Sequence, residues 1–146
     1  MPDRVAVKIT LTSTQDGESE VHTYKGEWFR KDRSVYIRYD ELVEGTEDPI
    51  RTLLRYKTGE LSITRRGVVE SDQLFVPGEA RRSGRYRSPY TSFAMETGTE
   101  LLAVKGENGE DLSLAEPPCT IEWKYELWIH EHLSGRFHNR LHIQEE

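Results

Sequence analysis

Three histidines near the C-terminal end of the sequence have the residue type and the spacing of a metal site. His130 and His132 are two positions apart, on one side of an extended strand, and His138 follows after a short break. A three-residue loop at Leu133–Gly135 places His138 opposite His130, and three imidazoles near one point bind zinc or copper. The pattern fixes no cysteine or carboxylate beside them. We therefore expect a solvated outer face and predict neither a metal nor a cofactor.

A second group combines a phenol, a carboxylate and a guanidinium. Alternation along the chain predicts that Tyr39, Glu41 and Arg65 all point inward. A carboxylate and a guanidinium are each costly to bury alone but tolerable as a hydrogen-bonded pair. Such a pair either plugs one end of the fold as a structural ion pair or offers polar groups at the mouth of a ligand cavity.

Arginines and tyrosines alternate in a third group. Arg81–Arg87 contains four arginines, and Tyr86 and Tyr90 are close by. This combination stacks on bases or holds phosphates in some proteins, although a strand bent at Pro89 explains the same residues more simply. The 20 Lys and Arg against 26 Asp and Glu give a net charge of −6, which argues against DNA and anionic membranes as partners.

Signs of catalysis are absent from the pattern. Ser88 and Ser92 are not set in a nucleophile elbow, and no glycine-rich phosphate loop is present. We therefore predict that the protein is not an enzyme. The single cysteine, Cys119, excludes an internal disulfide. Without an apolar leader or a transmembrane-length apolar run, we expect a cytoplasmic protein.

The elements that must position these groups are β-strands, because apolar and polar residues alternate along nearly the whole chain. Charged residues make up 32% of the chain and hydrophobic residues 35%, which fits strands buried on one face. Gly26 is expected to mark a bulge. The predicted strands are Arg4–Thr12, Ser19–Phe29, Ser34–Val43, Ile50–Lys57, Glu60–Arg66, Val68–Val76, Gly84–Glu96, Thr99–Lys105 and the two arms of a final hairpin, Thr120–Ile143.

Two hairpin registers can be predicted from their turns. Thr58-Gly59 fits a two-residue turn, with glycine supplying the positive φ. This turn pairs Tyr56 with Leu61, Leu54 with Ile63 and Thr52 with Arg65. In the final hairpin, the Leu133–Gly135 loop pairs His130 with His138, Trp128 with Arg140 and Glu126 with His142. The second register predicts a cation–π pair between Trp128 and Arg140 on the outer face.

Nine to ten strands and no helical periodicity predict an all-β fold. Sequential hairpins favour a single antiparallel up-and-down β-barrel over residues 1–146 rather than a sandwich, because closure leaves no exposed edge.

An ordered set of residues also resembles a known family. The set comprises Val35-x-Ile37-x-Tyr39-x-Glu41, Ile63-Thr64-Arg65-x-Gly67, Phe75-x-Pro77-Gly78, Tyr86–Tyr90 and Tyr125-Glu126-Leu127. It is similar to the YwiB-type family of small bacterial proteins of unassigned function, over Val5–Ile143. The resemblance implies a calycin-like (lipocalin-like) barrel and no catalytic residues. The chain departs from the family at Ser88–Thr91, where Thr-Pro-Tyr-Gly is usual, and in the longer stretch Glu110–Cys119.

These observations lead to three functional hypotheses. In the first, the barrel binds a small, partly apolar molecule in its lumen, and its mouth is lined or closed by Tyr39, Glu41, Arg65, Tyr86 and Tyr90. In the second, the barrel is solid, and its outer surface at Arg81–Arg87 or around Trp128 binds a protein or RNA partner. In the third, the histidine face binds a metal, or His22 binds haem. We predict the first function and keep the second as its alternative.

Overall fold

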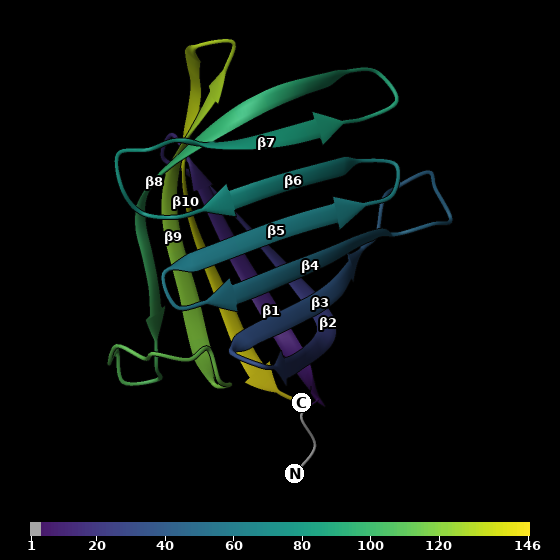
Figure 1. Cartoon of the computed structure of the whole chain (residues 1–146). Helices are drawn as coiled ribbons and strands as arrows, with labels where there is room; N and C mark the ends of the chain where they lie inside the picture. Colours follow the sequence, from purple (N-terminus) through teal and green to yellow (C-terminus); the bar gives the residue numbers. More distant parts are fainter. Residues whose placement is uncertain (1–3) are drawn as a thin grey trace.

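The computed structural model describes residues 4–146 and consists of ten antiparallel strands that close into one barrel (Figure 1). The strands are β1 (Arg4–Gln15), β2 (Glu18–Lys31), β3 (Ser34–Glu41), β4 (Ile50–Lys57), β5 (Glu60–Arg66), β6 (Glu70–Phe75), β7 (Arg82–Arg87), β8 (Ser92–Lys105), β9 (Cys119–Ile129) and β10 (His132–Glu145). Each strand pairs with its neighbours in sequence, and β1 pairs with β10 to close the ring. The predicted all-β up-and-down barrel is confirmed.

Two long strands turn the corners between the walls of the barrel. In Figure 1, β4–β7 cross the direction of β9, β10 and β1. Strand β2 pairs with β1 from Glu18 to Phe29 and with β3 from Gly26 to Lys31. Strand β8 pairs first with β7 and then, from Glu96 onward, with β9. Both strands therefore belong to two walls, which makes the barrel one continuous sheet.

Gly26 does not form the predicted bulge, because the β1–β2 ladder runs through it without a register shift. A Cβ atom at this position would lie 2.4 Å from the carbonyl oxygen of Arg38 and 2.9 Å from Cδ1 of Ile9. The glycine is needed because β2 and β3 approach closely where β2 begins its second ladder.

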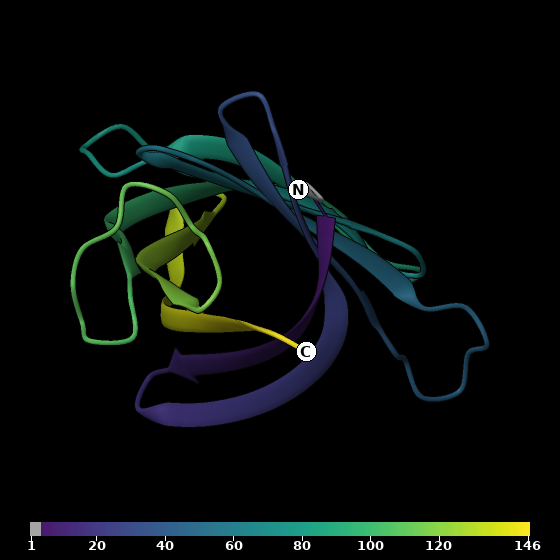
Figure 2. The same cartoon turned by 90° about the horizontal axis from the view of Figure 1, so that it is seen from below.

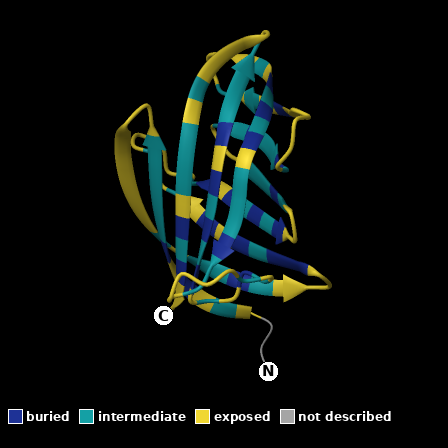
Figure 3. Ribbon diagram, turned by 90° about the vertical axis from the view of Figure 1, so that its left-hand side faces the viewer, coloured by how far each residue is buried: buried dark blue, intermediate teal, exposed yellow. Residues whose placement is uncertain are grey.

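Alternation correctly predicts the buried face of most strands (Figure 3). The predicted register of the β4–β5 hairpin is also confirmed, with Thr52 opposite Arg65. The largest fully buried side chains are Trp123, Phe75, Ile9, Ile37, Leu54, Leu61, Ile121, Leu141, Ile143, Val7, Val35 and Thr52.

The segment 106–118 covers part of one end of the barrel, the same end as the C-terminus (Figures 1 and 2). Ala115 is fully buried in the core, and its carbonyl oxygen accepts a 2.6 Å hydrogen bond from Nε1 of Trp28. Nη1 of Arg30 lies 2.7 Å from Oε1 of Glu116, so an ion pair connects β2 to the end of this segment. Leu112 and Leu114, whose alternation resembles a strand, lie in this segment and outside every strand. Within residues 4–146 there is no helix that is long and apolar enough to cross a membrane.

The predicted strand Gly84–Glu96 is wrong, because the chain reverses direction inside it. Strand β7 ends at Arg87 and β8 begins at Ser92, so Pro89 lies in a turn rather than in a bent strand. The amide of Ser88 donates to the carbonyl of Thr91 at 2.8 Å, which closes this turn. The predicted strand Thr99–Lys105 is the second part of β8.

The predicted register of the final hairpin is also wrong. The turn is formed by His130 and Glu131, both at positive φ (51° and 66°), and not by Leu133–Gly135. Trp128 therefore faces Leu133, and a bulge follows before Gly135. Gly135 instead packs closely against side chains: a Cβ there would lie 3.0 Å from the Phe137 ring and 3.1 Å from Nε2 of Gln15.

Candidate functional site

A pocket of about 870 Å³ opens to solvent at the end of the lumen away from segment 106–118, and its lining includes the exposed residues Glu20, Asp40 and Leu42. Every strand except β7 and β8 contributes to its lining. The apolar part of the wall includes Leu11, Leu54, Ile63 and Trp123. A volume of this size accommodates one drug-sized molecule.

An ion pair lies in the wall of this pocket. The cross-strand row Tyr39, Thr52 and Arg65 runs over β3, β4 and β5, and Glu41 is two residues beyond Tyr39 on the same face. Arg65 donates to Glu41 from Nε to Oε2 at 2.9 Å and from Nη2 to Oε1 at 3.0 Å. The hydroxyl of Thr52 donates to Glu41 Oε2 at 2.5 Å. The side chains of Arg65 and Glu41 are 30% and 21% exposed, so the predicted inward-facing pair is half-buried.

Aromatic rings form the neighbouring part of the wall. Tyr24 stacks on Tyr39 with ring centroids 4.4 Å apart and planes 22° apart, and His22 continues the stack at 6.3 Å. Burial, and then the nearby Glu41 carboxylate, raise the pKa of both tyrosines above that of a free phenol. These hydroxyls therefore stay protonated and act as neutral hydrogen-bonding groups at neutral pH.

Trp123, which also lines the pocket, carries a buried donor without a partner. Trp123 is 2% exposed, and among residues 4–146 its Nε1 and the hydroxyl of Thr99 are the buried side-chain atoms without hydrogen-bond partners. Other polar groups of the lining are engaged: Ser13 donates to Oδ1 of Asn139 at 2.7 Å. Gln73 Nε2 is 3.5 Å from the hydroxyl of Thr97.

Two of the five predicted site residues lie outside this pocket. Tyr86 faces Ser71, which in turn faces Arg65, so Tyr86 stands two strands away from the ion pair and stacks on Phe93 at 5.0 Å. Tyr90 is 95% exposed in the β7–β8 turn. The structure brings together Tyr39, Glu41 and Arg65 and leaves the other two at a different part of the surface.

Sequence reasoning missed the part of the site on β2 and β9. A bulge at Gly26 would change which side chains of β2 face inward, so alternation alone does not assign His22 and Tyr24 to the lumen. The unpaired donor of Trp123 becomes visible only when its neighbours are known. The signal that was available is the alternation of His22, Tyr24 and Gly26 along one face.

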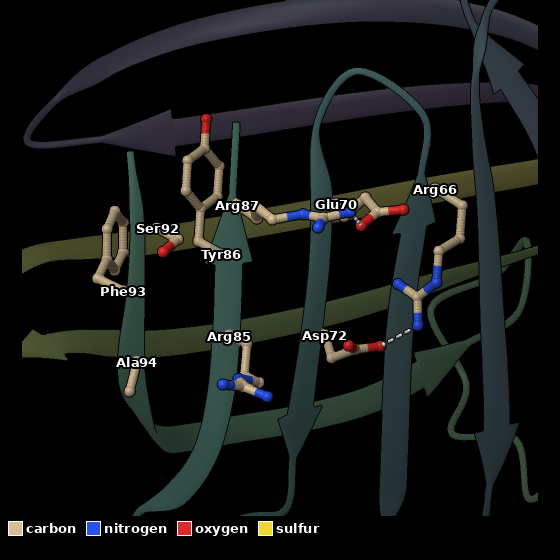
Figure 4. A pocket seen from close by; sticks show the side chains of 9 residues that line it. All are labelled: Arg66, Glu70, Asp72, Arg85, Tyr86, Arg87, Ser92, Phe93 and Ala94. Carbon is tan, nitrogen blue, oxygen red and sulfur yellow. Dashed lines mark hydrogen bonds and ion pairs between the residues drawn. The ribbon is translucent and has the colours of Figure 1, made fainter. Parts of the chain in front are cut away.

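The predicted basic segment borders a different, outer pocket of about 610 Å³ (Figure 4). Arg66 donates to Asp72 at 2.9 Å, and Arg87 is paired with Glu70. A carboxylate from β6 therefore pairs with one of the four arginines of this segment, Arg87, whereas Arg82 and Arg85 have no ion-pair partner among the described residues.

The predicted Trp128–Arg140 pair is wrong, because the hairpin register differs. Arg81 takes the place over the Trp128 ring, at 4.3 Å from its centroid, and lies 3.5 Å from Glu96. Arg140 instead donates from Nε to Oε2 of Glu122 at 3.1 Å.

The three late histidines do not converge. His138 faces Lys124 rather than His130, and its Nε2 is 2.5 Å from Oε2 of Glu122. His130 lies in the turn, and His132 begins β10. Across the described residues, no three His, Cys, Asp or Glu side chains are grouped so that they could hold a metal ion.

Comparisons with known proteins agree with this architecture. The uncharacterized beta-barrel protein YwiB of Bacillus subtilis (strain 168) is 29% identical over 100 residues, which are 67% of this chain and 68% of that protein. The crystal structure of ywiB protein from Bacillus subtilis has the same fold, with a TM-score of 0.76 and 20% identity over 100% of this chain and 95% of that chain. A family model described as "Domain of unknown function (DUF1934)" matches residues 5–142. The resemblance to YwiB-type proteins is thus confirmed, and the chain belongs to the DUF1934 family.

Proposed function

We propose that this barrel binds a small, partly apolar molecule in its lumen. The observation that supports the proposal is the pocket of about 870 Å³, whose apolar wall carries a few converging polar groups, as ligand sites do. Tyr39, Glu41 and Arg65 line its mouth, and Tyr24 and Trp123 form further parts of its wall. We also propose that the barrel is of the calycin-like type.

We propose binding without catalysis. Within residues 4–146, the carboxylate of Glu41 is engaged by Arg65 and Thr52 and is not free to act as a general base. We also propose a cytosolic location, which suits a chain whose one cysteine, Cys119, is buried and forms no disulfide.

The outer surface is a weaker candidate for the function. Arg87 and Arg66 are paired with carboxylates, and Arg81 is occupied by Trp128 and Glu96. This pairing reduces the charge available to RNA, and of the four arginines in Arg81–Arg87 only Arg82 and Arg85 have no ion-pair partner among the described residues. We therefore propose the lumen ahead of the alternative interaction module.

The test is native mass spectrometry of gently purified protein, compared with its denatured mass. We expect a discrete excess mass that disappears on denaturation. Ile63→Trp, which fills the pocket, should abolish it. Ala94→Trp, at the outer pocket, is the matched control and should retain it. A bare mass, together with no thermal stabilisation by any compound of a diverse small-molecule library, would refute the proposal.

A further inference from the structure

Strand β2 has a free backbone edge next to the luminal pocket. Its pairing with β1 begins at Glu18, whereas its pairing with β3 begins only at Gly26. Among the described residues, the stretch 18–25 therefore has a strand partner on one side and none on the other. This stretch contains no proline and no bulge, so its unpaired N–H and C=O groups keep the regular spacing of a strand. Such an edge is a template for pairing with another extended chain.

The end of β3 forms the other side of the same opening. Asp40 and Glu41 pair with β4, and within the described chain they have no strand partner on the side of β2. Strands β2 and β3 therefore separate beyond the pair formed by Gly26 and Tyr39. Their separation leaves a gap in the wall of the barrel.

The luminal pocket extends into this gap. Side chains of a strand alternate between its two faces, so a pocket against one face is lined by every second residue. Here consecutive residues of both strands contribute to the lining, 22–25 on β2 and 39–42 at the end of β3. The pocket therefore borders the backbone edges of the two strands as well as the inward face of the barrel.

A strand added to the free edge of β2 would place side chains in the lumen. It would lie about 4.8 Å from β2, and every second side chain would point toward the interior. The apolar lining there includes Leu11, Leu54, Ile63 and Trp123. In this mode of recognition, main-chain hydrogen bonds provide affinity and the pocket selects the side chain. One aliphatic side chain between two residues that face solvent fits this arrangement.

The charge of the opening favours a cationic segment. Glu41 is already paired with Arg65. The other charged residues of the lining are Glu20, Asp40 and Lys25, which leaves an excess of one carboxylate. The whole chain carries a net charge of −6, so two copies repel each other. A second copy of the chain is therefore a less favourable occupant of the edge than a basic peptide.

We propose that the ligand is a short, extended, cationic peptide segment that adds to residues 18–25 of β2 as a strand and places an aliphatic side chain in the lumen. This rests on the proposed function, because it identifies the chemical class that the luminal pocket takes. The free edge and the pocket are then two parts of one site.

The probe is the peptide acetyl-Lys-Thr-Leu-Thr-Lys-amide, titrated at low salt into the ¹⁵N-labelled protein and followed by NMR. In the free protein, we expect every second backbone amide of residues 18–25 to exchange quickly with solvent, because the amides between them face β1. Saturation with the peptide should slow exchange of the fast amides by at least about tenfold. A molecule that only filled the lumen would leave these amides without a hydrogen-bond partner.

Two backbone-methylated isomers of the probe test strand pairing itself. N-methylation of the leucine blocks one edge of the extended peptide, and N-methylation of both threonines blocks the other edge, with all side chains retained. Because β2 pairs with one edge, one isomer should bind at least about tenfold more weakly than the parent, and the other should stay within about threefold. At the same concentration, the weak isomer should leave the amides of residues 18–25 in fast exchange.

Side-chain variants of the probe test the pocket and the charge. Replacing the leucine by serine should weaken binding by at least about tenfold, because the lumen then buries no aliphatic group. Replacing both lysines by glutamate should weaken it by at least about threefold at low salt. Glu20→Gln should reduce this preference for lysine by about twofold. Glu145→Gln, an exposed carboxylate outside the lining, is the matched control and should leave the preference unchanged.

Equal affinities of the two methylated isomers would overturn the inference, and so would edge amides that stay in fast exchange with the parent peptide bound. Edge amides already protected in the free protein, together with a dimer in sedimentation, would assign the edge to a second copy of the chain and would also overturn it. A parent peptide that does not bind would have the same meaning. In that case, an excess mass in the native spectrum would still uphold binding in the lumen.

Discussion

The carboxylate of Glu41 accepts hydrogen bonds from two nitrogens of Arg65 and from the hydroxyl of Thr52. Because water reaches only about a fifth of the Glu41 side chain, this residue depends on its partners for most of its solvation. The pair is thus a structural requirement of the pocket wall as well as a polar feature offered to a ligand.

Arg65→Met should lower the free energy of unfolding by about 1–3 kcal/mol, because it leaves a half-buried carboxylate without its cation. Urea denaturation measures this loss. Arg87→Met is the control: its side chain is 67% exposed, and loss of its surface pair with Glu70 should change stability by less than about 1 kcal/mol. Equal effects of the two substitutions would contradict the role assigned to Arg65.

Burial also predicts sensitivity to alkali. It raises the pKa of Cys119 and that of Tyr125 to about 12 each. The unfolded thiol and phenol ionise near pH 8.5 and pH 10. The contribution of these groups to the free energy of unfolding is therefore fully present below about pH 8.5. It is lost as the pH rises toward 12, because the unfolded state releases its protons first.

We expect the free energy of unfolding at pH 10.5 to be lower than at pH 8 by about 3 kcal/mol, measured in urea. Cys119→Ala should show a smaller loss over the same interval, because it removes the buried thiol and leaves the buried tyrosines. A wild-type stability that stays constant up to pH 10.5 would refute this account.

The close approach of strands β2 and β3 depends on a glycine, Gly26. A methyl group on Gly26 would meet the backbone of β3, and the backbone cannot turn aside as the end of a side chain can. Gly98 on β8 differs, since the nearest atom to a Cβ there is the flexible Cγ of Arg81 at 3.6 Å.

Gly26→Ala should therefore destabilise the protein by about 2–3 kcal/mol, whereas Gly98→Ala should change stability by less than about 1 kcal/mol. Thermal and urea unfolding of the two variants give the comparison. A Gly26→Ala variant as stable as Gly98→Ala would show that β2 and β3 separate easily at this corner.

The turn between β9 and β10 can be improved. His130 and Glu131 occupy the left-handed region at φ 51° and 66°, where Asn and Gly are the favoured pair. Replacing them with Asn-Gly should raise the free energy of unfolding by about 0.5–1 kcal/mol in a urea titration. Gly135→Ala, three residues past the start of β10, should lower it because of the Phe137 ring. A less stable Asn-Gly variant together with a more stable Gly135→Ala variant would contradict the turn as described.

How far the sequence predicts each element depends on whether its turn residue has one role. Thr58-Gly59 sits alone between two alternating runs, so the β4–β5 register and the Glu41–Arg65 pair both follow from it. Gly135 leads to a wrong register for the β9–β10 hairpin. It packs closely against Phe137 and is not part of the turn, which two non-glycine residues form. The turn at Pro89 is hidden for the same reason, since proline suits both a bend and a turn.

The site is less predictable than the strands, because it is assembled from side chains far apart in sequence. Parity places Tyr39, Glu41 and Arg65 on the inner face. It does not reveal that Tyr24 stacks on Tyr39 or that Trp123 lacks an acceptor. Those properties depend on how the walls cross, which local alternation does not encode.

At the scale of the whole molecule, the first and last strands are neighbours. The amide of Glu146 donates to the carbonyl of Ala6 at 3.2 Å, so the end of the chain lies beside the beginning of β1. The loop between β3 and β4 is exposed and contains Gly45 at φ 85°. These positions suit a circular permutation.

A permutant that joins residue 146 to residue 4 through a short glycine linker and begins at Thr46 should fold to the same barrel, with a melting temperature within about 10 °C of the wild type. Circular dichroism and thermal unfolding provide the measurement. A permutant opened inside β5, before Arg65, is the control and should fail to fold. Failure of both would indicate that closure by β1 and β10 needs the natural connectivity.

Pairing of β1 with β10 also has a consequence for synthesis. The ribosome releases β1 early and β10 last among the described strands, so β1 must wait for most of the chain before its second partner exists. During that interval, β1 and the growing end both expose unpaired strand edges to other nascent chains. The barrel therefore closes only after β10 has left the ribosome, so the unpaired edges of β1 and of the growing end are exposed on the nascent chain and no longer on the closed barrel.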